Sequence, residues 1–218
     1  MTYRVSFIII VISVFIKLLA IYYTEFSLFG DEAQYWLWSK SPELGYYSKP
    51  PLLAWLINFY TFVFGSSFVI LKCFPLFFYF FTTYVIYLLS YELYENKKLA
   101  ALTAASFYLL PSVSVSSFLI STDVVLIPLC SLTLLILLKI RKDPKIINFV
   151  YLGIFLGLSF LTKYAALYYI ISIILIFAFD NKLRSFLFLK FFNLLFFVFC
   201  FFIVLLPNIF WNFKNSWI

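Results

Sequence analysis

The sequence predicts an all-α integral membrane protein, and three observations carry that prediction. Of its 218 residues, 65% are hydrophobic and 24% aromatic. Only 11% are charged, whereas a soluble globular domain carries about 25%. Several apolar runs reach the ~20 residues that a helix needs to cross a bilayer. These runs are apolar on every face, which excludes the short alternating segments of a transmembrane β-barrel.

The apolar runs predict about seven spans, because most reach the ~17-residue lower limit for crossing a membrane. They cover residues 5–23, 68–91, 99–119, 123–140, 146–162, 164–180 and 186–206. A further run at 52–64 is too short to span. It follows Pro50 and Pro51 and contains Trp55 and Tyr60, residue types that favour the membrane interface. We expect it to be a membrane-parallel helix within a first external loop of about residues 24–67.

Basic residues set the expected orientation, because lysine and arginine gather in cytoplasmic loops. With seven spans, three loops rich in these residues fall on the same side as Arg4. They contain Lys97, Lys98, Arg141, Lys142, Lys145, Lys182 and Arg184. We therefore expect a multi-pass protein of the cell membrane (inner or plasma membrane) with a cytoplasmic N-terminus. This distribution also accounts for the net charge of +7, so no nucleic acid is expected as a partner.

Two adjacent carboxylates, Asp31 and Glu32, follow the first span. Ionisable groups at a membrane boundary are costly to desolvate, so they indicate a functional site. The plainer interpretation is that these acids begin a helix, and Asp123 can do the same for a later one. In the predicted topology all three acids meet Lys49 and Lys163 at the non-cytoplasmic boundary. Carboxylates there can orient or deprotonate a hydroxyl, and lysines can hold an anionic headgroup.

Other kinds of site find little support in the sequence. The chain has no histidine, and its three cysteines lie inside apolar runs without a CxxC pair. It has no glycine-rich phosphate loop, nucleophile elbow or metal motif. The sequence therefore predicts no metal site and no certain cofactor, and it leaves dependence on a divalent metal open.

Four motifs occur in the order found in GT-C glycosyltransferases. They are Asp31-Glu32, the segment from Tyr46 to Leu52 (YYSKPPL), Thr122-Asp123, and the segment from Gly157 to Lys163 (GLSFLTK). Together they resemble most closely the bacterial aminoarabinose transferases (ArnT-like enzymes) and the dolichyl-phosphate-mannose-dependent protein O-mannosyltransferases. The resemblance covers essentially the whole chain.

This resemblance implies a membrane glycosyltransferase. Such an enzyme takes a sugar from a polyprenyl-phosphate-linked donor and passes it to a lipid, glycan or protein acceptor. The reaction would take place on the non-cytoplasmic face, by a single inverting displacement. Gln34 stands where ArnT-like enzymes can carry an arginine, which argues against an aminoarabinose donor.

The resemblance also implies roles for individual residues. Asp31 matches the acid that engages the acceptor, Glu32 is its neighbour in the motif, and Asp123 matches the second acidic position. Lys49 resembles the residue that contacts the donor phosphate, and Lys163 is a weaker candidate for the same task. The tyrosines expected around the substrate are Tyr35, Tyr46 and Tyr47.

Residues 1–218 are expected to form a single GT-C-like transmembrane module, without the C-terminal half of the family. A separate polypeptide that supplies this half is therefore a further expected partner, besides the donor, the acceptor and membrane lipid. Two alternatives stay open. One is a multi-pass transporter or lipid flippase, which would place ionisable residues near the membrane midplane. The other is an inactive truncated transferase.

Overall fold

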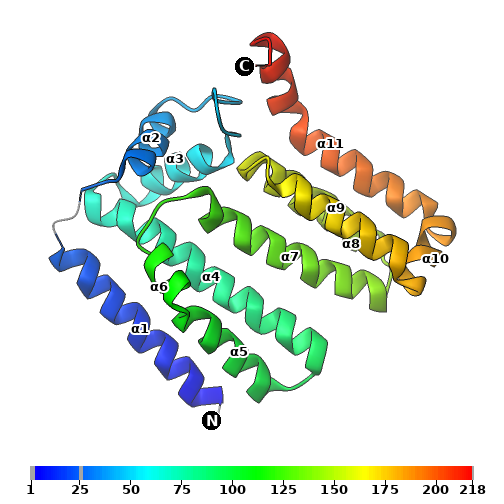
Figure 1. Cartoon of the computed structure of the whole chain (residues 1–218), viewed down its shortest axis with the longest axis horizontal. Coiled ribbons are helices and arrows are strands. Elements are labelled where there is room, and N and C mark those ends of the chain that lie inside the picture. The colour runs from blue at the N-terminus through cyan, green and yellow to red at the C-terminus, as the bar shows by residue number, and fades with distance from the viewer. Residues whose placement is uncertain (1–2, 25–26, 218) are drawn as a thin grey trace. The chain divides into compact units, whose positions relative to one another are not determined.

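A computed structural model describes residues 3–24 and 27–217, and within these it consists of α-helices without strands (Figure 1). This confirms the predicted all-α membrane class. Residues 25–26 of the predicted external loop lie outside the described residues. The helices are α1 (Tyr3–Tyr23), α2 (Gly30–Lys40), α3 (Leu52–Phe64), α4 (Phe68–Tyr94), α5 (Lys97–Leu109), α6 (Pro111–Ser116), α7 (Thr122–Lys142), α8 (Ile146–Thr162), α9 (Ala166–Phe179), α10 (Asn181–Leu189) and α11 (Phe191–Lys214).

The helices form two compact units. The first contains residues 1–42 and 53–128, and the second contains residues 43–52 and 129–218. The boundary falls within α7, after Pro128. The loop before α3 therefore belongs to the second unit, although most of α3 belongs to the first.

Four of the described helices are long and apolar enough to cross a membrane: α1, α4, α7 and α11. Helices α3, α8 and α9 are apolar but shorter. Phe15 of α1 and Phe199 of α11 are exposed, as suits helices that face lipid rather than water. The count of seven spans and their orientation stay predictions.

Two predicted spans were wrong in their boundaries. Residues 99–119 do not form one helix, because α5 ends at Leu109 and α6 begins with Pro111. Proline fits the first position of a helix, where the missing N–H costs nothing. The last predicted span covered residues 186–206, yet α11 starts at Phe191 and continues through Pro207 to Lys214. Prolines are tolerated inside membrane helices when nearby groups satisfy the freed backbone.

In the first unit, α1, α4 and α5 pack against one another, and α6 follows α5 (Figure 1). Ala100, Ala104 and Ala105 of α5 are buried, and such small side chains let membrane helices approach closely. The Lys17 ammonium of α1 lies 4.0 Å from the centroid of the buried Tyr108 ring of α5. This cation–π contact offsets part of the cost of an amine within an apolar helix.

In the second unit, α8 and α11 form the main helix pair. Gly153 and Gly157 make it possible, because a Cβ atom on Gly153 would come within 2.3 Å of the Phe197 carbonyl oxygen. Small residues spaced four apart are a common contact surface between membrane helices. Helices α9 and α10 complete the unit around a core that includes Ile140, Phe149 and Leu152.

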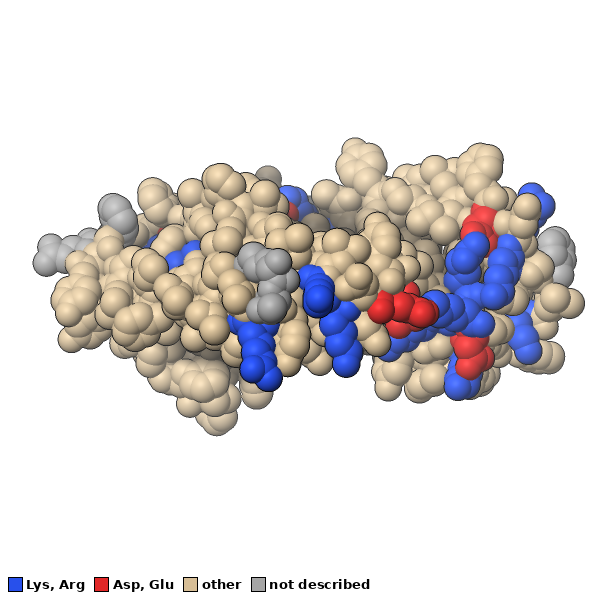
Figure 2. All heavy atoms as spheres, turned by 90° about the horizontal axis from the view of Figure 1, so that it is seen from below, with Lys and Arg blue, Asp and Glu red and all other residues tan. Residues whose placement is uncertain are grey.

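Basic side chains gather where α7 ends and α8 and α10 begin. Figure 2 shows such blue side chains with red carboxylates among them. Arg141 pairs with Asp180 at 2.8 Å, and Lys145 pairs with Asp143 at 2.8 Å. These ion pairs are exposed and contribute little to stability.

Candidate functional site

The acidic pair occupies the first turn of α2, where carboxylates suit the positive end of the helix dipole. Asp31 is exposed, whereas Glu32 is only 2% exposed. The two neighbours therefore have different surroundings. Asp31 is open to a ligand, and Glu32 points into the protein.

The Glu32 carboxylate joins three segments of the first unit. At the start of α2 it accepts a hydrogen bond from the backbone N–H of the N-cap residue Phe29 at 2.9 Å, one half of a capping box. The ammonium of Lys72 on α4 donates to both oxygens, at 2.9 and 2.7 Å. The N–H of Ile120, just before α7, donates at 2.8 Å. These donors occupy both oxygens of the Glu32 carboxylate, which favours a structural role for this side chain. A catalytic role for Glu32 stays a prediction.

Asp31 and Tyr35 lie on α2, and Asp123 lies in the first turn of α7, within the first unit. Tyr35 lies one helical turn after Asp31 on the same face of α2, and it is buried. Burial raises the pKa of Tyr35, and the negative charges of Asp31 and Asp123 raise it further. Two acids from separate helices thus act on one phenol. A protonated Tyr35 can donate a hydrogen bond to a substrate oxygen.

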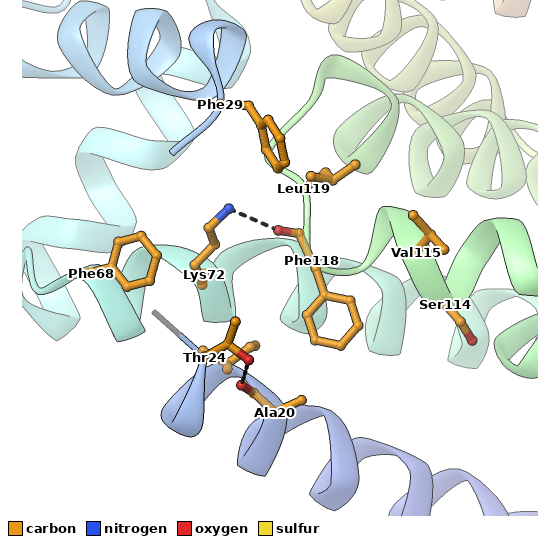
Figure 3. Close-up of a pocket in the computed structure, with 10 residues that line it drawn as sticks. Ala20, Thr24, Phe29, Phe68, Lys72, Ser114, Val115, Phe118 and Leu119 are labelled. Carbon is orange, nitrogen blue, oxygen red and sulfur yellow. Dashed lines mark hydrogen bonds between the residues drawn. The ribbon is translucent and has the colours of Figure 1, made fainter. Parts of the chain in front are cut away.

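A cavity of about 530 Å³ lies in the first unit, between α1, α4 and the segment around α6 (Figure 3). Its walls are mainly hydrocarbon and include Phe29, Phe68 and Phe118. Lys72 also lines it, and its ammonium donates to the Phe118 carbonyl oxygen at 3.3 Å as well as to Glu32. Such a lining suits the apolar part of a ligand.

The predicted phosphate contact Lys49 belongs to a folded loop in the second unit. The N–H of Tyr46 donates to the Lys49 carbonyl oxygen at 3.3 Å. The Tyr46 hydroxyl in turn accepts from the N–H of Glu43 at 3.1 Å. Burial raises the pKa of Tyr46, whose side chain is part of the loop's own packing. Tyr47 is 77% exposed, so it presents its ring freely, whereas the other two predicted tyrosines, Tyr35 and Tyr46, are buried.

The second predicted phosphate contact, Lys163, caps the end of α8. The next residue, Tyr164, donates its hydroxyl proton to the Asn208 side-chain oxygen of α11 at 3.3 Å. The Asn208 amide nitrogen donates to the carbonyl oxygen of Leu44, in the loop that carries Lys49, at 3.0 Å. One asparagine therefore links the segments of both lysines.

Sequence reasoning missed several of these residues. Lys72 stood inside an apolar run, and an ionisable residue within a span is itself a signal of function or pairing. Asn208 lies beyond the predicted span 186–206, so its place on a helix was not foreseen. Among the described residues, no three cysteine, aspartate or glutamate side chains lie close enough to share a metal ion.

Comparison with known proteins bears on this arrangement. The family described as "Dolichyl-phosphate-mannose-protein mannosyltransferase" matches residues 48–211. The lipid A galacturonosyltransferase RgtD of Rhizobium johnstonii is 32% identical over 194 residues, which cover 86% of this chain and 39% of that protein. The chain thus spans about two fifths of the length of this relative. No solved structure matches it.

The family match covers most of the chain, and four of the described helices are long and apolar enough to cross a membrane. The chain belongs to the dolichyl-phosphate-mannose-protein mannosyltransferase family. The resemblance to GT-C and ArnT-like enzymes is thereby confirmed.

Proposed function

We propose that this chain transfers a sugar from a polyprenyl-phosphate-linked donor to an acceptor hydroxyl on the non-cytoplasmic face of the cell membrane. The observation that carries the proposal is a pair of acids, Asp31 and Asp123, in the first turns of two helices that begin in the first unit, α2 and α7. The family match and the lysine-bearing loop at residues 43–49 support it. The relative is named for galacturonosyl transfer to lipid A, which makes a lipid one acceptor to test beside glycan and protein.

The proposed reaction is a single inverting displacement. The acceptor oxygen forms a bond to the anomeric carbon while the bond from that carbon to the phosphate oxygen breaks. Asp31 takes the acceptor proton, and Tyr35 and Asp123 orient the sugar or the acceptor. The electron pair leaves with the polyprenyl phosphate, whose charge Lys49 and Lys163 stabilise. In this scheme Glu32 holds α2 in place, through Lys72 and Ile120.

The test is Asp31→Asn in the purified full chain in lipid nanodiscs. Polyprenyl-phosphate mannose and galacturonic acid are supplied separately with lipid A, and transferred sugar is detected by mass spectrometry. We expect kcat to fall by about 10²–10⁴-fold, the usual contribution of a general base, because asparagine cannot accept the proton. Donor affinity should be retained, since Asp31 is assigned to the acceptor.

The control is Asp143→Asn, which removes an exposed carboxylate at the opposite end of α7 from Asp123. It should leave kcat unchanged. An Asp31→Asn protein with the wild-type kcat would remove the base from the mechanism. Movement of the donor lipid between leaflets without any transferred sugar would instead support the flippase.

A further inference from the structure

We propose that Asn208 is a positioning residue for Lys49, fastening the loop of residues 43–49 to the last turns of α11. The inference rests on the proposed function in one respect, namely that Lys49 contacts the donor phosphate. Asn208 has no such contact in this proposal. It acts by fixing where the loop, and hence the lysine, is held.

The Asn208 side chain is the centre of a polar junction. It is only 3% exposed. Its nitrogen donates to the Leu44 carbonyl oxygen at 3.0 Å, and its oxygen accepts from the Tyr164 hydroxyl at 3.3 Å and from the Asn212 amide at 3.2 Å. This combination needs a donor and an acceptor on one short side chain, which an amide supplies and a carboxylate or aliphatic group does not.

Two further contacts join the loop of residues 43–49 to the C-terminal end of α11. The Trp211 ring N–H donates to the Glu43 carboxylate at 3.1 Å. Gly45 lies so close to α11 that a Cβ atom there would come within 2.5 Å of the Trp211 ring and 2.9 Å of the Asn208 nitrogen. The absence of a side chain at Gly45 therefore allows the backbone to reach Asn208.

The position of Lys49 depends on this attachment. Leu44, which Asn208 holds, lies beside Glu43, whose N–H donates to the Tyr46 hydroxyl. Tyr46 in turn donates its N–H to the Lys49 carbonyl oxygen. On the other side of Lys49, the buried Pro50 and Pro51 fix their φ angles and restrict the residue before them. The backbone of Lys49 is thus held from both sides. On its N-terminal side, the hydrogen bonds run through Tyr46, Glu43 and Leu44 to Asn208.

A double-mutant cycle tests whether Asn208 acts through Lys49. Binding of undecaprenyl phosphate to the purified full chain in nanodiscs is measured by native mass spectrometry. The variants are Asn208→Ala, Lys49→Ala and the double variant. Each single change should weaken binding by roughly ten- to a hundred-fold, the range for loss of a charge-assisted contact. In the double variant, Asn208→Ala should add little to Lys49→Ala, because a positioning residue has no effect once its target is gone.

Asn193→Ala is the matched control. Asn193 lies near the other end of α11 and donates to the Pro144 carbonyl oxygen at 3.0 Å, the same kind of side-chain-to-backbone bond. It should leave binding at the wild-type level. If Asn208→Ala weakened binding equally in the wild-type protein and in the Lys49→Ala variant, it would act by general damage to the fold. That result would overturn the inference.

A spectroscopic measurement separates this inference from the proposed function. Ser48 is exposed, so a spin label on Ser48→Cys reports the mobility of the loop once the three native cysteines are replaced by alanine. Asn208→Ala should give a more mobile spectrum, and Asn193→Ala should not. If Lys49→Ala binds undecaprenyl phosphate as wild type does, Lys49 does not contact the donor phosphate. The spectrum still tests whether Asn208 holds the loop of residues 43–49. An unchanged spectrum for Asn208→Ala would overturn the assignment.

Discussion

At the scale of single residues, Glu32 shows how neighbouring acids acquire different tasks. Its carboxylate is buried and paired at 2.7 Å with the ammonium of Lys72, which is also buried. A buried ion pair gains stability only when its remaining hydrogen-bonding groups are satisfied. The N–H groups of Phe29 and Ile120 and the Phe118 carbonyl meet that condition. The pair can therefore tie α2 and α4 to the segment before α7, which is also the segment that leads to Asp123.

This pairing predicts that Lys72→Met destabilises the protein. The change leaves the Glu32 carboxylate buried without its cation, which should lower the free energy of unfolding by about 3 kcal/mol, at the low end for a broken buried pair, because two backbone donors remain. Denaturant titration in detergent measures the change. Lys40→Met is the control, since Lys40 is exposed over the Trp36 ring and should cost less than about 1 kcal/mol. Equal losses of stability from the two changes would contradict a stabilising role for the Glu32–Lys72 pair.

At the scale of helices, the α8–α11 contact makes a second stability prediction. Gly153→Ala places a methyl group against the Phe197 backbone oxygen, which cannot rotate away. Overpacking of this kind typically costs about 1–3 kcal/mol. Gly30→Ala is the control, because nothing lies within 4 Å of its added Cβ atom. Thermal unfolding should show a loss for Gly153→Ala and none for Gly30→Ala. A Gly153→Ala protein as stable as wild type would show that the two helices part easily.

The helices also show which features the sequence could predict. Long apolar runs gave the helices α1, α4 and α7 within a few residues, because a membrane span needs length and apolarity. Proline was ambiguous: Pro75, Pro128 and Pro207 lie inside helices, whereas Pro111 begins one. Which outcome occurs depends on whether neighbouring groups satisfy the freed backbone. That information lies in tertiary contacts, so a single sequence does not contain it.

The candidate site divides in the same way. Asp31 and Asp123 could be selected from sequence because acids at the end of an apolar run are unusual. The partners of Glu32 could not, since Lys72 and Ile120 lie 40 and 88 residues away along the chain. The link from Leu44 to Asn208 spans 164 residues. Such pairings follow from packing rather than from a local pattern.

At the scale of the whole molecule, the distribution of charge predicts the topology. Basic residues lie at 97–98, 139–145 and 182–184, at helix ends and in one short connection, and lysine and arginine are retained on the cytoplasmic side. The proposed reaction then requires α2, the loop at 43–49 and the start of α7 to be on the opposite side. Reversing the orientation would place the acids in the cytoplasm, away from a donor presented externally.

Cysteine labelling decides this orientation. Ser41→Cys and Lys97→Cys are made separately in a chain whose native cysteines are replaced by alanine, and both positions are exposed. A membrane-impermeant maleimide added to intact cells should label Ser41→Cys and leave Lys97→Cys unlabelled, because α4 separates the two positions and is long enough to span. After the membrane is permeabilised, both should react, which shows that each thiol is accessible. Labelling of Lys97→Cys alone in intact cells would reverse the topology and move the proposed reaction to the cytoplasmic face. Labelling of both would show that α4 does not separate the two compartments.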